Sequence, residues 1–404
     1  MSGPLLYLFD DRRARTWAPF ALTRPVGELR YGCLTARERS ERVLGLACAG
    51  HLADAALEGF DEPEAAPVVQ ADDVPPEATR ILLSSRAVLD FQEPPEAQGP
   101  ARLALAGETV GWVVPPGRPL PPQAALLDPT SDGHGPSVAL AGEVLARPWS
   151  LVGGTPGRLV RDMAHLFPGT DTPEGVVRFG EGALSLGEEA VVEPGVVVDT
   201  RQGPVRLDAG VRVEGPARLV GPLYVAAGST ILGGSVGTSS IGPVCKVRGE
   251  VADSVILGFV NKAHDGFLGH AMLGYWVNLG ALTTNSDLKN NYGTIRMWTP
   301  DGALDTGLVK MGCLLGDHVK TGIGTLLNTG TVIGAGSNVF GGLMPPTVVP
   351  PFSWGAGGDL SKYRLDKLVD TAEAAMARRG RSLTPGARHI LERAWRRTHG
   401  DSAP

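Results

Sequence analysis

A histidine with charged neighbours is the feature of this sequence most able to do chemistry. His264 lies in the polar segment 261–270, and an imidazole group can take a proton from an attacking amine or hydroxyl near neutral pH. Lys262, Arg248 and Lys320 could supply the positive charge that phosphate groups require. A lone histidine is equally typical of an ordinary surface, and scattered lysines are typical of solvated side chains. These residue types alone therefore leave both interpretations open.

The histidine lies where a regular repeat is interrupted. The segment 276–292 continues as a polar excursion to about Lys310, and the repeat resumes at Leu315. Because a rigid scaffold can position loop side chains without moving itself, function is usually placed on such an excursion. The sequence therefore predicts a site at this interruption.

The repeat has a period of six residues and dominates the second half of a chain with 55 glycines. Such a period fits neither a 3.6-residue helix nor the period-two alternation and Asn-Gly or Asp-Gly turns of an antiparallel β protein. It predicts triangular coils whose aliphatic residues point inward, with glycine at corners that need positive φ. We therefore expect a left-handed parallel β-helix from about Val176 to Val349. The inward positions are Leu219, Val225, Ile231, Ile241, Val247, Leu315, Thr321, Leu327, Ile333 and Val339.

The segments around the repeat predict further domains. Apolar runs at 5–9 and 81–83, with a capping-box spacing between Thr35 and Glu38, are typical of an α/β domain. Thr155-Pro156 is expected to open a connecting helix. After the repeat, we expect one amphipathic helix over 365–376, ending near Gly380, and another from Thr384-Pro385, which cap the coils or contact a neighbouring subunit. The predicted divisions are an α/β domain over 1–149, a connecting helix over 150–170, a β-helix over 171–350 and a helical extension over 351–404.

Composition excludes several classes of protein. The 37 basic and 43 acidic residues give a net charge of −6 without a basic block, so no nucleic-acid partner is expected. No run approaches the roughly 18 apolar residues that a membrane span needs, so no membrane partner is expected. Four scattered cysteines indicate neither a disulfide framework nor a zinc site. They fit a reduced, cytoplasmic setting, with Cys245 and Cys313 expected as buried repeat residues.

Several motifs together resemble a known family. The resemblance is to the bifunctional N-acetylglucosamine-1-phosphate uridylyltransferase and glucosamine-1-phosphate acetyltransferase family, and most closely to its branch of related sugar nucleotidyltransferases. It covers most of the chain, and its central motifs are specific. They are Lys262 with His264, Val277-Asn-Leu-Gly-Ala281, Thr283-Thr-Asn285, Leu315-Gly-Asp-His-Val-Lys-Thr-Gly322, Leu8-Phe-Asp-Asp11, 22–30 and Phe352-Ser-Trp354.

For the β-helix, the resemblance implies acetyl transfer within a homotrimer. His264 matches the catalytic base that deprotonates the amino group of a sugar phosphate for attack on acetyl-CoA. Positions matching Arg248, Lys262 and Asn285 hold the acceptor. Acetyl-CoA is expected between adjacent β-helices, with contacts at Lys320, Gly322 and Gly334. Phe267 stands where related enzymes have a tyrosine.

For the N-terminal half, the resemblance implies a nucleotidyltransferase-like, Rossmann-like domain. Such a domain needs a glycine-rich loop for the phosphates and a carboxylate for Mg²⁺, yet no glycine occurs between Asp10 and Gly27. The sequence Ser84-Ser85 stands where the family has a metal-binding aspartate. Asp10 or Asp11 could bind Mg²⁺ and, with it, a nucleoside triphosphate. The predicted nucleotide-binding residues are Arg12, Arg13 and Arg24, and Arg15 and Arg30 could also engage phosphates.

Three function classes follow. The first is acetyl-CoA-dependent N-acetyl transfer to an amino-sugar 1-phosphate in the β-helix, with nucleotidyl transfer in the N-terminal domain. The second is a sugar-1-phosphate nucleotidyltransferase with a structural β-helix, which Phe267 favours and His264 counts against. The third is a non-catalytic trimeric scaffold that binds nucleotide sugars, which the lost glycine loop favours.

Overall fold

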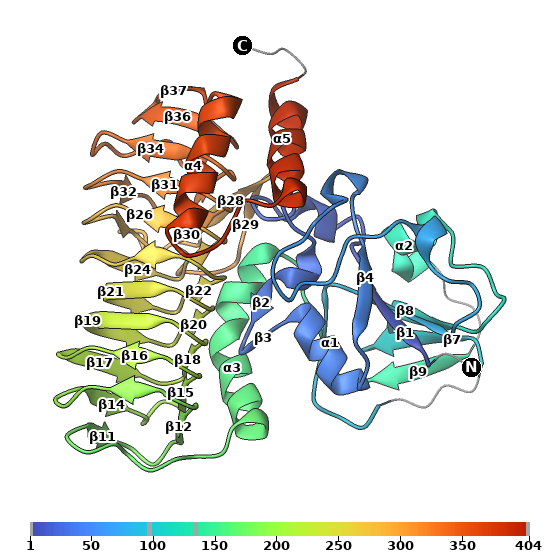
Figure 1. Cartoon of the computed structure of the whole chain (residues 1–404), viewed down its shortest axis with the longest axis horizontal. Helices are drawn as coiled ribbons and strands as arrows, with labels where there is room; N and C mark the ends of the chain where they lie inside the picture. Colours follow the sequence, from blue (N-terminus) through green and yellow to red (C-terminus); the bar gives the residue numbers. More distant parts are fainter. Residues whose placement is uncertain (1–2, 95–98, 132–135, 401–404) are drawn as a thin grey trace.

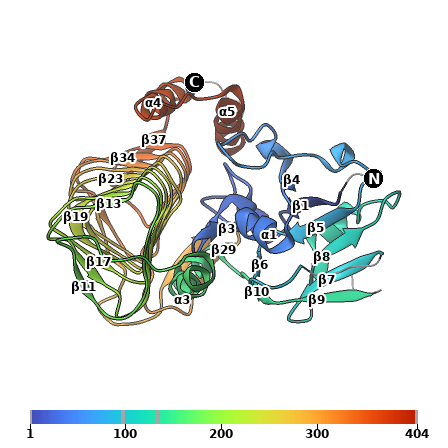
Figure 2. The ribbon, with the colours of Figure 1, turned by 60° about the horizontal axis from the view of Figure 1, so that its bottom comes forward.

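The structure, a computed structural model, describes residues 3–94, 99–131 and 136–400. An N-terminal α/β domain and a β-helix lie side by side, and the long helix α3 (Pro148–Leu166) runs between them (Figure 1). Figure 2 shows the coils of the β-helix nearly end-on, as a stack of triangles. The predicted combination of an α/β domain with a β-helix is confirmed.

A six-stranded sheet forms the N-terminal domain, and β1 lies between two parallel neighbours, β4 and β5. The carboxyl ends of β1, β4 and β5 therefore meet at one edge of the sheet, which brings together the residues that follow them. The strands in spatial order are β4 (Cys48–Leu52), β1 (Leu5–Phe9), β5 (Arg80–Ser84), β8 (Glu108–Val114), β7 (Ala101–Leu105) and β9 (Ser137–Leu140).

Smaller elements complete this domain. The predicted capping box is confirmed, because Thr35 Oγ1 accepts from Glu38 N at 3.1 Å and Glu38 Oε2 accepts from Thr35 N at 2.7 Å. The paired strands are β2 (Arg30–Tyr31) with β3 (Leu34–Thr35) and β6 (Ala87–Leu89) with β10 (Gly142–Val144). The helices are α1 (Ala36–Leu44) and α2 (Gln123–Leu127), with short 3-10 turns η1 (Ala14–Thr16), η2 (Val26–Glu28), η3 (Ala55–Leu57), η4 (Ala71–Asp73) and η5 (Pro129–Ser131).

The β-helix stacks short parallel strands on three faces. One face is a nine-stranded sheet that turns toward the N-terminal domain. Its strands are β12 (Leu184–Leu186), β15 (Val205–Leu207), β18 (Leu223–Val225), β20 (Ser240–Ile241), β22 (Val255–Ile256), β25 (Met272–Leu273), β30 (Cys313–Leu315), β33 (Thr331–Ile333) and β35 (Val348–Val349). Its regular register means that any residue type recurring in one coil position forms a column along the stack.

The other two faces join at their corners into one fourteen-stranded sheet. Its strands are β11 (Val177–Phe179), β13 (Val191–Val192), β14 (Val197–Asp199), β16 (Arg212–Val213), β17 (Ala217–Val220), β19 (Thr230–Gly237), β21 (Lys246–Ala252), β23 (Asn261–Lys262), β24 (Phe267–Gly269), β26 (Asn278–Leu279), β31 (Lys320–Thr321), β34 (Asn338–Phe340), β36 (Ser353–Ala356) and β37 (Asp359–Lys362). The pair β27 (Thr284–Asn285) with β32 (Leu326–Leu327) and the hairpin of β28 (Arg296–Thr299) with β29 (Gly302–Asp305) stand apart.

The inward positions predicted from the six-residue period are all buried in the prism, as are Cys245 and Cys313. Glycine at the corners lets the coils stack closely. A Cβ atom on Gly242 would lie 1.7 Å from the carbonyl oxygen of Leu257 on the next coil. The period therefore predicted the core of this half correctly.

Helix α3 begins at Pro148, so the prediction that Thr155-Pro156 opens the helix is wrong. Pro148 occupies the first turn, where no N–H donor is needed, and the buried residues Trp149 and Leu151 continue the helix into the core between the domains. Pro156 lies inside the helix, and the hydroxyl of Thr155 donates to the carbonyl of Leu151 at 2.6 Å. Burial of the apolar first turns therefore outweighs the interior proline.

Both predicted C-terminal helices are present, as α4 (Leu365–Ala377) and α5 (Pro385–His399). They lie along the side of the last coils (Figures 1 and 2). Met376 of α4 packs on Phe259 and Trp276 of the β-helix, whereas Ile390 of α5 packs in the N-terminal domain. The prediction that these helices cap the coils or contact a neighbouring subunit did not include the contact by which α5 joins the two domains.

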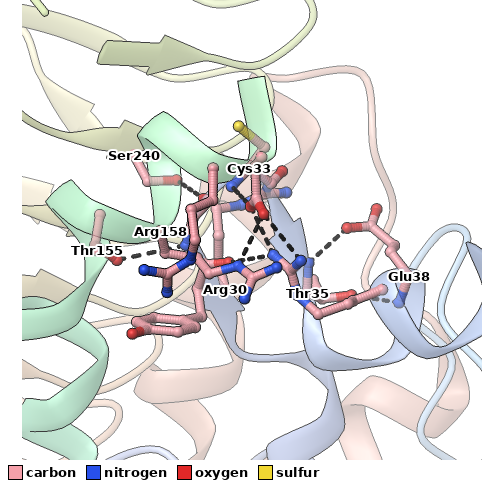
Figure 3. Close-up of polar contacts among 12 residues, drawn as sticks. Arg30, Cys33, Thr35, Glu38, Thr155, Arg158 and Ser240 are labelled. Atoms are coloured by element: carbon pink, nitrogen blue, oxygen red, sulfur yellow. Dashed lines mark hydrogen bonds and ion pairs between the residues drawn. The ribbon is translucent and has the colours of Figure 1, made fainter. Parts of the chain in front are cut away.

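Buried polar contacts also join the domains beside α3 (Figure 3). Ser240 Oγ of the β-helix donates to the carbonyl of Gly32 at 2.6 Å. Nearby, the buried carboxylate of Asp162 accepts from Arg39 at 2.6 Å and from Arg158 at 2.8 Å. Apolar side chains of both domains also pack together here, with Cys33 and Leu159 in one cluster with Tyr224 of the β-helix. In the described part of the chain, no helix is long and apolar enough to cross a membrane.

Candidate functional site

A cavity of about 650 Å³, here called the junction pocket, lies where the N-terminal domain meets the β-helix. It opens at the carboxyl ends of parallel strands, which is where ligands bind in open α/β sheets. Its polar residues from the N-terminal domain are Asp10, Arg12, Arg15 and Thr16 after β1 and Asp54 after β4. The opposite wall includes Trp298 and Pro300 of the β28–β29 hairpin, Gly334 and 348–351 of the β-helix, and Arg397 and Thr398 of α5.

The arginines give the junction pocket its charge. Arg15 is held by the strand ends, because Nε donates to the carbonyl of Asp10 at 3.0 Å and Nη2 to that of Ala53 at 3.1 Å. Arg397 pairs with Asp54 at 2.9 Å. Arg12 is exposed, and its guanidinium has no hydrogen-bond partner among the described residues. Its side chain is therefore available to an anionic ligand.

The carboxylates near this pocket are already engaged. Asp10 accepts from Ser85 Oγ at 2.6 Å and from Val26 N at 3.2 Å, and burial raises its pKa. Asp11 accepts from Arg86 at 2.6 Å and from Ala14 N at 2.8 Å. Within the described ranges, no group of three or more His, Cys, Asp or Glu residues could hold a metal ion. These residues do not fit a resident Mg²⁺ ion, whose ligands are free carboxylates and waters.

Of the three predicted nucleotide-binding arginines, Arg12 alone lines the junction pocket. Arg13 is exposed one residue further along the chain. Arg24 is only 1% exposed and donates from Nε to Asp317 Oδ2 of the β-helix at 2.9 Å. Its other nitrogens donate to Glu62 at 2.9 Å and 2.5 Å. Arg24 is therefore not available to a phosphate, because it belongs to a buried ion-pair network between the domains.

Asp317 completes this network from the β-helix. Its Oδ2 atom also accepts from Thr23 Oγ1 at 2.7 Å, and its Oδ1 atom accepts from Tyr275 N at 2.8 Å. The Arg24 guanidinium lies 4.2 Å from the centre of the Tyr275 ring. Two motifs that the sequence presents separately, around Thr23 and around Asp317, thus bind each other.

His264 is exposed at the corner between β23 and β24, and its ring has no hydrogen-bond partner among the described residues. Arg248 and Asp265 form an exposed pair close by in sequence and register, at 3.2 Å. Lys262 points inward, where Nζ donates to the carbonyls of Arg248 at 2.7 Å and His264 at 2.5 Å. Burial lowers the pKa of Lys262 to about 8. Lys262 therefore shapes the corner that presents His264.

Asn285 is likewise buried, and its side chain makes a reciprocal pair with the backbone of Gly269. Oδ1 accepts from Gly269 N and Nδ2 donates to Gly269 O, both at 2.9 Å. The structure thus places Lys262 and Asn285 inside the coils beside the His264 corner, and their predicted acceptor-binding role remains a prediction. Phe267, in place of the expected tyrosine, lies partly buried in β24 between them.

The three predicted coenzyme contacts do not share one cavity. Gly334 lines the junction pocket, whereas Lys320 lies beneath α4. Gly322 donates its N–H to the carbonyl of Val339 within the stack. Their predicted contact with acetyl-CoA remains a prediction. Sequence reasoning missed Asp54, although a polar residue directly after a buried strand is a signal for this edge.

Comparisons with known proteins agree with this arrangement. Residues 6–169 match the family model described as sugar nucleotidyl transferase. The chain is 29% identical over 93 residues, 23% of each chain, to a bifunctional sugar-1-phosphate nucleotidylyltransferase/acetyltransferase of Sulfurisphaera tokodaii. It is 27% identical over 229 residues, 51% of this chain and 41% of the relative, to the bifunctional protein GlmU of Acaryochloris marina.

The matched regions span less than half the length of these curated relatives. Over residues 6–169, the N-terminal domain is therefore similar to sugar nucleotidyl transferases. The chain as a whole is related to the bifunctional GlmU-like proteins, as the sequence motifs predicted.

The Arg24 network predicts a large loss of stability on truncation. Replacing Arg24 by alanine leaves Asp317 and Glu62 without their buried cation, so we expect the free energy of unfolding to fall by about 3–5 kcal/mol in urea denaturation. Arg13→Ala, at an exposed position, should change it by less than about 0.5 kcal/mol. Equal stability of the two variants would show that the network does not hold the domains.

Proposed function

We propose that the junction pocket binds the phosphate groups of a sugar 1-phosphate and a nucleoside triphosphate, and that the N-terminal domain transfers the nucleotidyl group. The observation that carries this proposal is the position of Arg12 and Arg15, which follow β1 at the carboxyl edge of the sheet and line a cavity of about 650 Å³. The match of residues 6–169 to sugar nucleotidyl transferases supports the same chemistry.

The reaction requires charge neutralisation above all. A phosphate oxygen of the sugar 1-phosphate attacks the α-phosphorus of the triphosphate, the bond from that phosphorus to the β-phosphate oxygen breaks, and pyrophosphate leaves. Both substrates are anions, so guanidinium groups that face them stabilise the approach and the departing charge. Arg12 has free donors for this role, and Arg15 adds positive charge from a fixed position between two strand ends.

The walls of the pocket indicate where the rest of the substrate lies. Trp298 and Pro300 offer an apolar surface opposite the arginines, and 348–351 adds a second apolar side. A ligand with a charged centre and a planar or sugar ring matches this combination, because apolar walls with a few polar groups are typical of small-molecule sites. Both domains would then contact the same substrate.

Arg12 and its neighbour Arg13 provide a matched test of nucleotidyl transfer. In Arg12→Gln the pocket loses one unpaired guanidinium, so kcat/KM for pyrophosphate release from a nucleoside triphosphate and a sugar 1-phosphate should fall by about 10- to 100-fold. Arg13→Gln should retain the wild-type rate. Binding of nucleotide sugars without turnover in the wild type would instead support a non-catalytic scaffold, and equal rates in both variants would remove Arg12 from the site.

Acetyl transfer at the His264 corner is the second candidate function. It is favoured by the exposure of His264 on a corner that Lys262 and Asn285 hold in shape from inside. In this reaction the amino group of a sugar phosphate attacks the thioester carbonyl of acetyl-CoA, His264 takes the amine proton, and the thiolate of coenzyme A leaves. The relatives whose names include acetyltransferase or GlmU support this candidate.

A second histidine controls the test of acetyl transfer. We expect release of free coenzyme A from acetyl-CoA with glucosamine 1-phosphate or another amino-sugar phosphate, and at least about a 100-fold slower rate in His264→Ala because the general base is lost. His389→Ala, an exposed histidine on α5, should be unchanged. No release with any acceptor would reject acetyl transfer and leave the β-helix as structural support.

Homotrimer formation is the third part of the proposal. Exposed apolar side chains lie on successive coils beside the His264 corner, where Leu282 N donates to the carbonyl of Asp265 and Gly324 N donates to that of Ala281. Ile323, next to Gly324, is 72% exposed. Leu282 and Leu326 belong to the same apolar patch, since Thr284 pairs with Leu326 across these coils. Leu343 and Met344 extend it on later coils. Burial of such a patch between copies of the chain would be favourable.

Light scattering of the purified chain tests this assembly. The mass in solution should be three times that of one chain, and Ile323→Ser should shift the population toward monomers because it removes the most exposed apolar side chain of the patch. Val160→Ser, at an exposed position on α3, should leave the mass unchanged. A monomeric wild type would contradict the trimer.

A further inference from the structure

A second polar cavity lies beneath α4, separate from the junction pocket. This α4 pocket has a volume of about 430 Å³ and lies between α4 and one face of the β-helix. Met376 closes one side by packing on Phe259 and Trp276. The charged and amide residues that line it are Lys246, Asn261, Asn278, Lys320, Arg378 and Arg379.

The cations of the α4 pocket lack counterions within the protein. Among the described residues, Lys246, Lys320, Arg378 and Arg379 form no ion pair, and no lining residue is acidic. The acidic residues of α4 pair elsewhere, since Asp370 binds Lys367 and Glu373 binds Arg388. Such a concentration of positive charge is unusual in a chain whose net charge is −6. It indicates that an anion from outside the protein completes the pocket.

The floor of the pocket is a column of residues, one from each successive coil. Lys246 pairs in register with Asn261, Asn261 with Asn278, and Asn278 with Lys320. Asn261 Nδ2 donates to Asn278 Oδ1 at 2.9 Å. Strands about 4.8 Å apart place the two lysine backbones roughly 14 Å apart along the column. The column therefore suits a ligand with several charged groups better than a single small ion.

Lys320 is half-buried, whereas Lys246 and Arg378 are exposed. Its ammonium is near the carbonyl of His318 at 3.5 Å, and burial lowers its pKa to about 8. A partly desolvated ammonium without a counterion is unfavourable, and a bound anion would offset this desolvation. Lys320, like the other cations of the pocket, therefore favours the binding of an anion, because it has no counterion within the protein.

We propose that the α4 pocket binds an oligophosphate group, either free or carried on a nucleotide, at a site distinct from the junction pocket. Lys246 and Lys320 bind it from the two ends of the column, and Arg378 and Arg379 cover it from the end of α4. The pocket is a cavity of about 430 Å³ between a helix and one face of the coils, a size that suits a small molecule.

Calorimetric titration of the full chain with tripolyphosphate tests the site. The wild type should bind, and Lys320→Gln and Arg379→Gln should each bind at least about tenfold more weakly, since each loses a charge-assisted contact. Lys367→Gln, an exposed lysine of α4 outside the pocket, is the matched control and should bind like the wild type. No binding by the wild type, or equal affinity in all four proteins, would overturn the proposal.

Two further titrations identify the source of the phosphates and the location of the site. In Arg12→Gln, which weakens the junction pocket, ATP that binds no more tightly than tripolyphosphate would support recognition of the phosphates alone, and ATP that binds more tightly would support a nucleotide. Because the junction pocket is itself proposed to bind the phosphates of a nucleoside triphosphate, the tripolyphosphate titration is repeated in Arg12→Gln, where the binding that Lys320→Gln weakens should persist. Affinity that is lost in Arg12→Gln and kept in Lys320→Gln would move the binding to the junction pocket and contradict a separate site.

Discussion

The structure depends on the guanidinium of Arg24, which is buried between two carboxylates from different parts of the chain. Arg24 contacts Glu62 within its own domain and Asp317 in the β-helix, and the ring of Tyr275 covers it. Away from water, such a pair is favourable only when its partners are correctly placed, so it selects one arrangement of the domains. The rigid stack of coils then holds the far wall of the junction pocket in position opposite the strand ends.

This constraint gives the β-helix several roles. Its nine-stranded face is buried against α3 and the N-terminal domain, and another face carries α4 near the last coils. The corner with His264 and the apolar patch around Ile323 are exposed to solvent. The junction pocket, the His264 corner and the α4 pocket are therefore built from different residues of one scaffold.

The parts of the fold that were predictable are those with local or periodic signals. The six-residue period predicted the buried positions from Leu219 to Val339, and Thr35 and Thr384 marked helix starts. Arg24 shows the limit, since its partner Asp317 lies 293 residues away and no local pattern joins them. The motifs indicated that Arg24 and Asp317 have a role, but they could not distinguish a contact with a ligand from a contact between domains. The start of α3 was missed for the same reason, because its first turns are stabilised by packing on the other domain.

We propose that both domains contact one nucleotide-sugar ligand in the junction pocket. Hydrogen–deuterium exchange of the full chain with and without UDP-N-acetylglucosamine tests it most directly, because exchange slows in backbone that a ligand orders. We expect the backbone amides to exchange more slowly both at 10–16, after β1, and at 296–300, in the hairpin. These two segments contribute residues to opposite walls of the pocket. Protection confined to one wall, or found only around His264, would contradict this proposal.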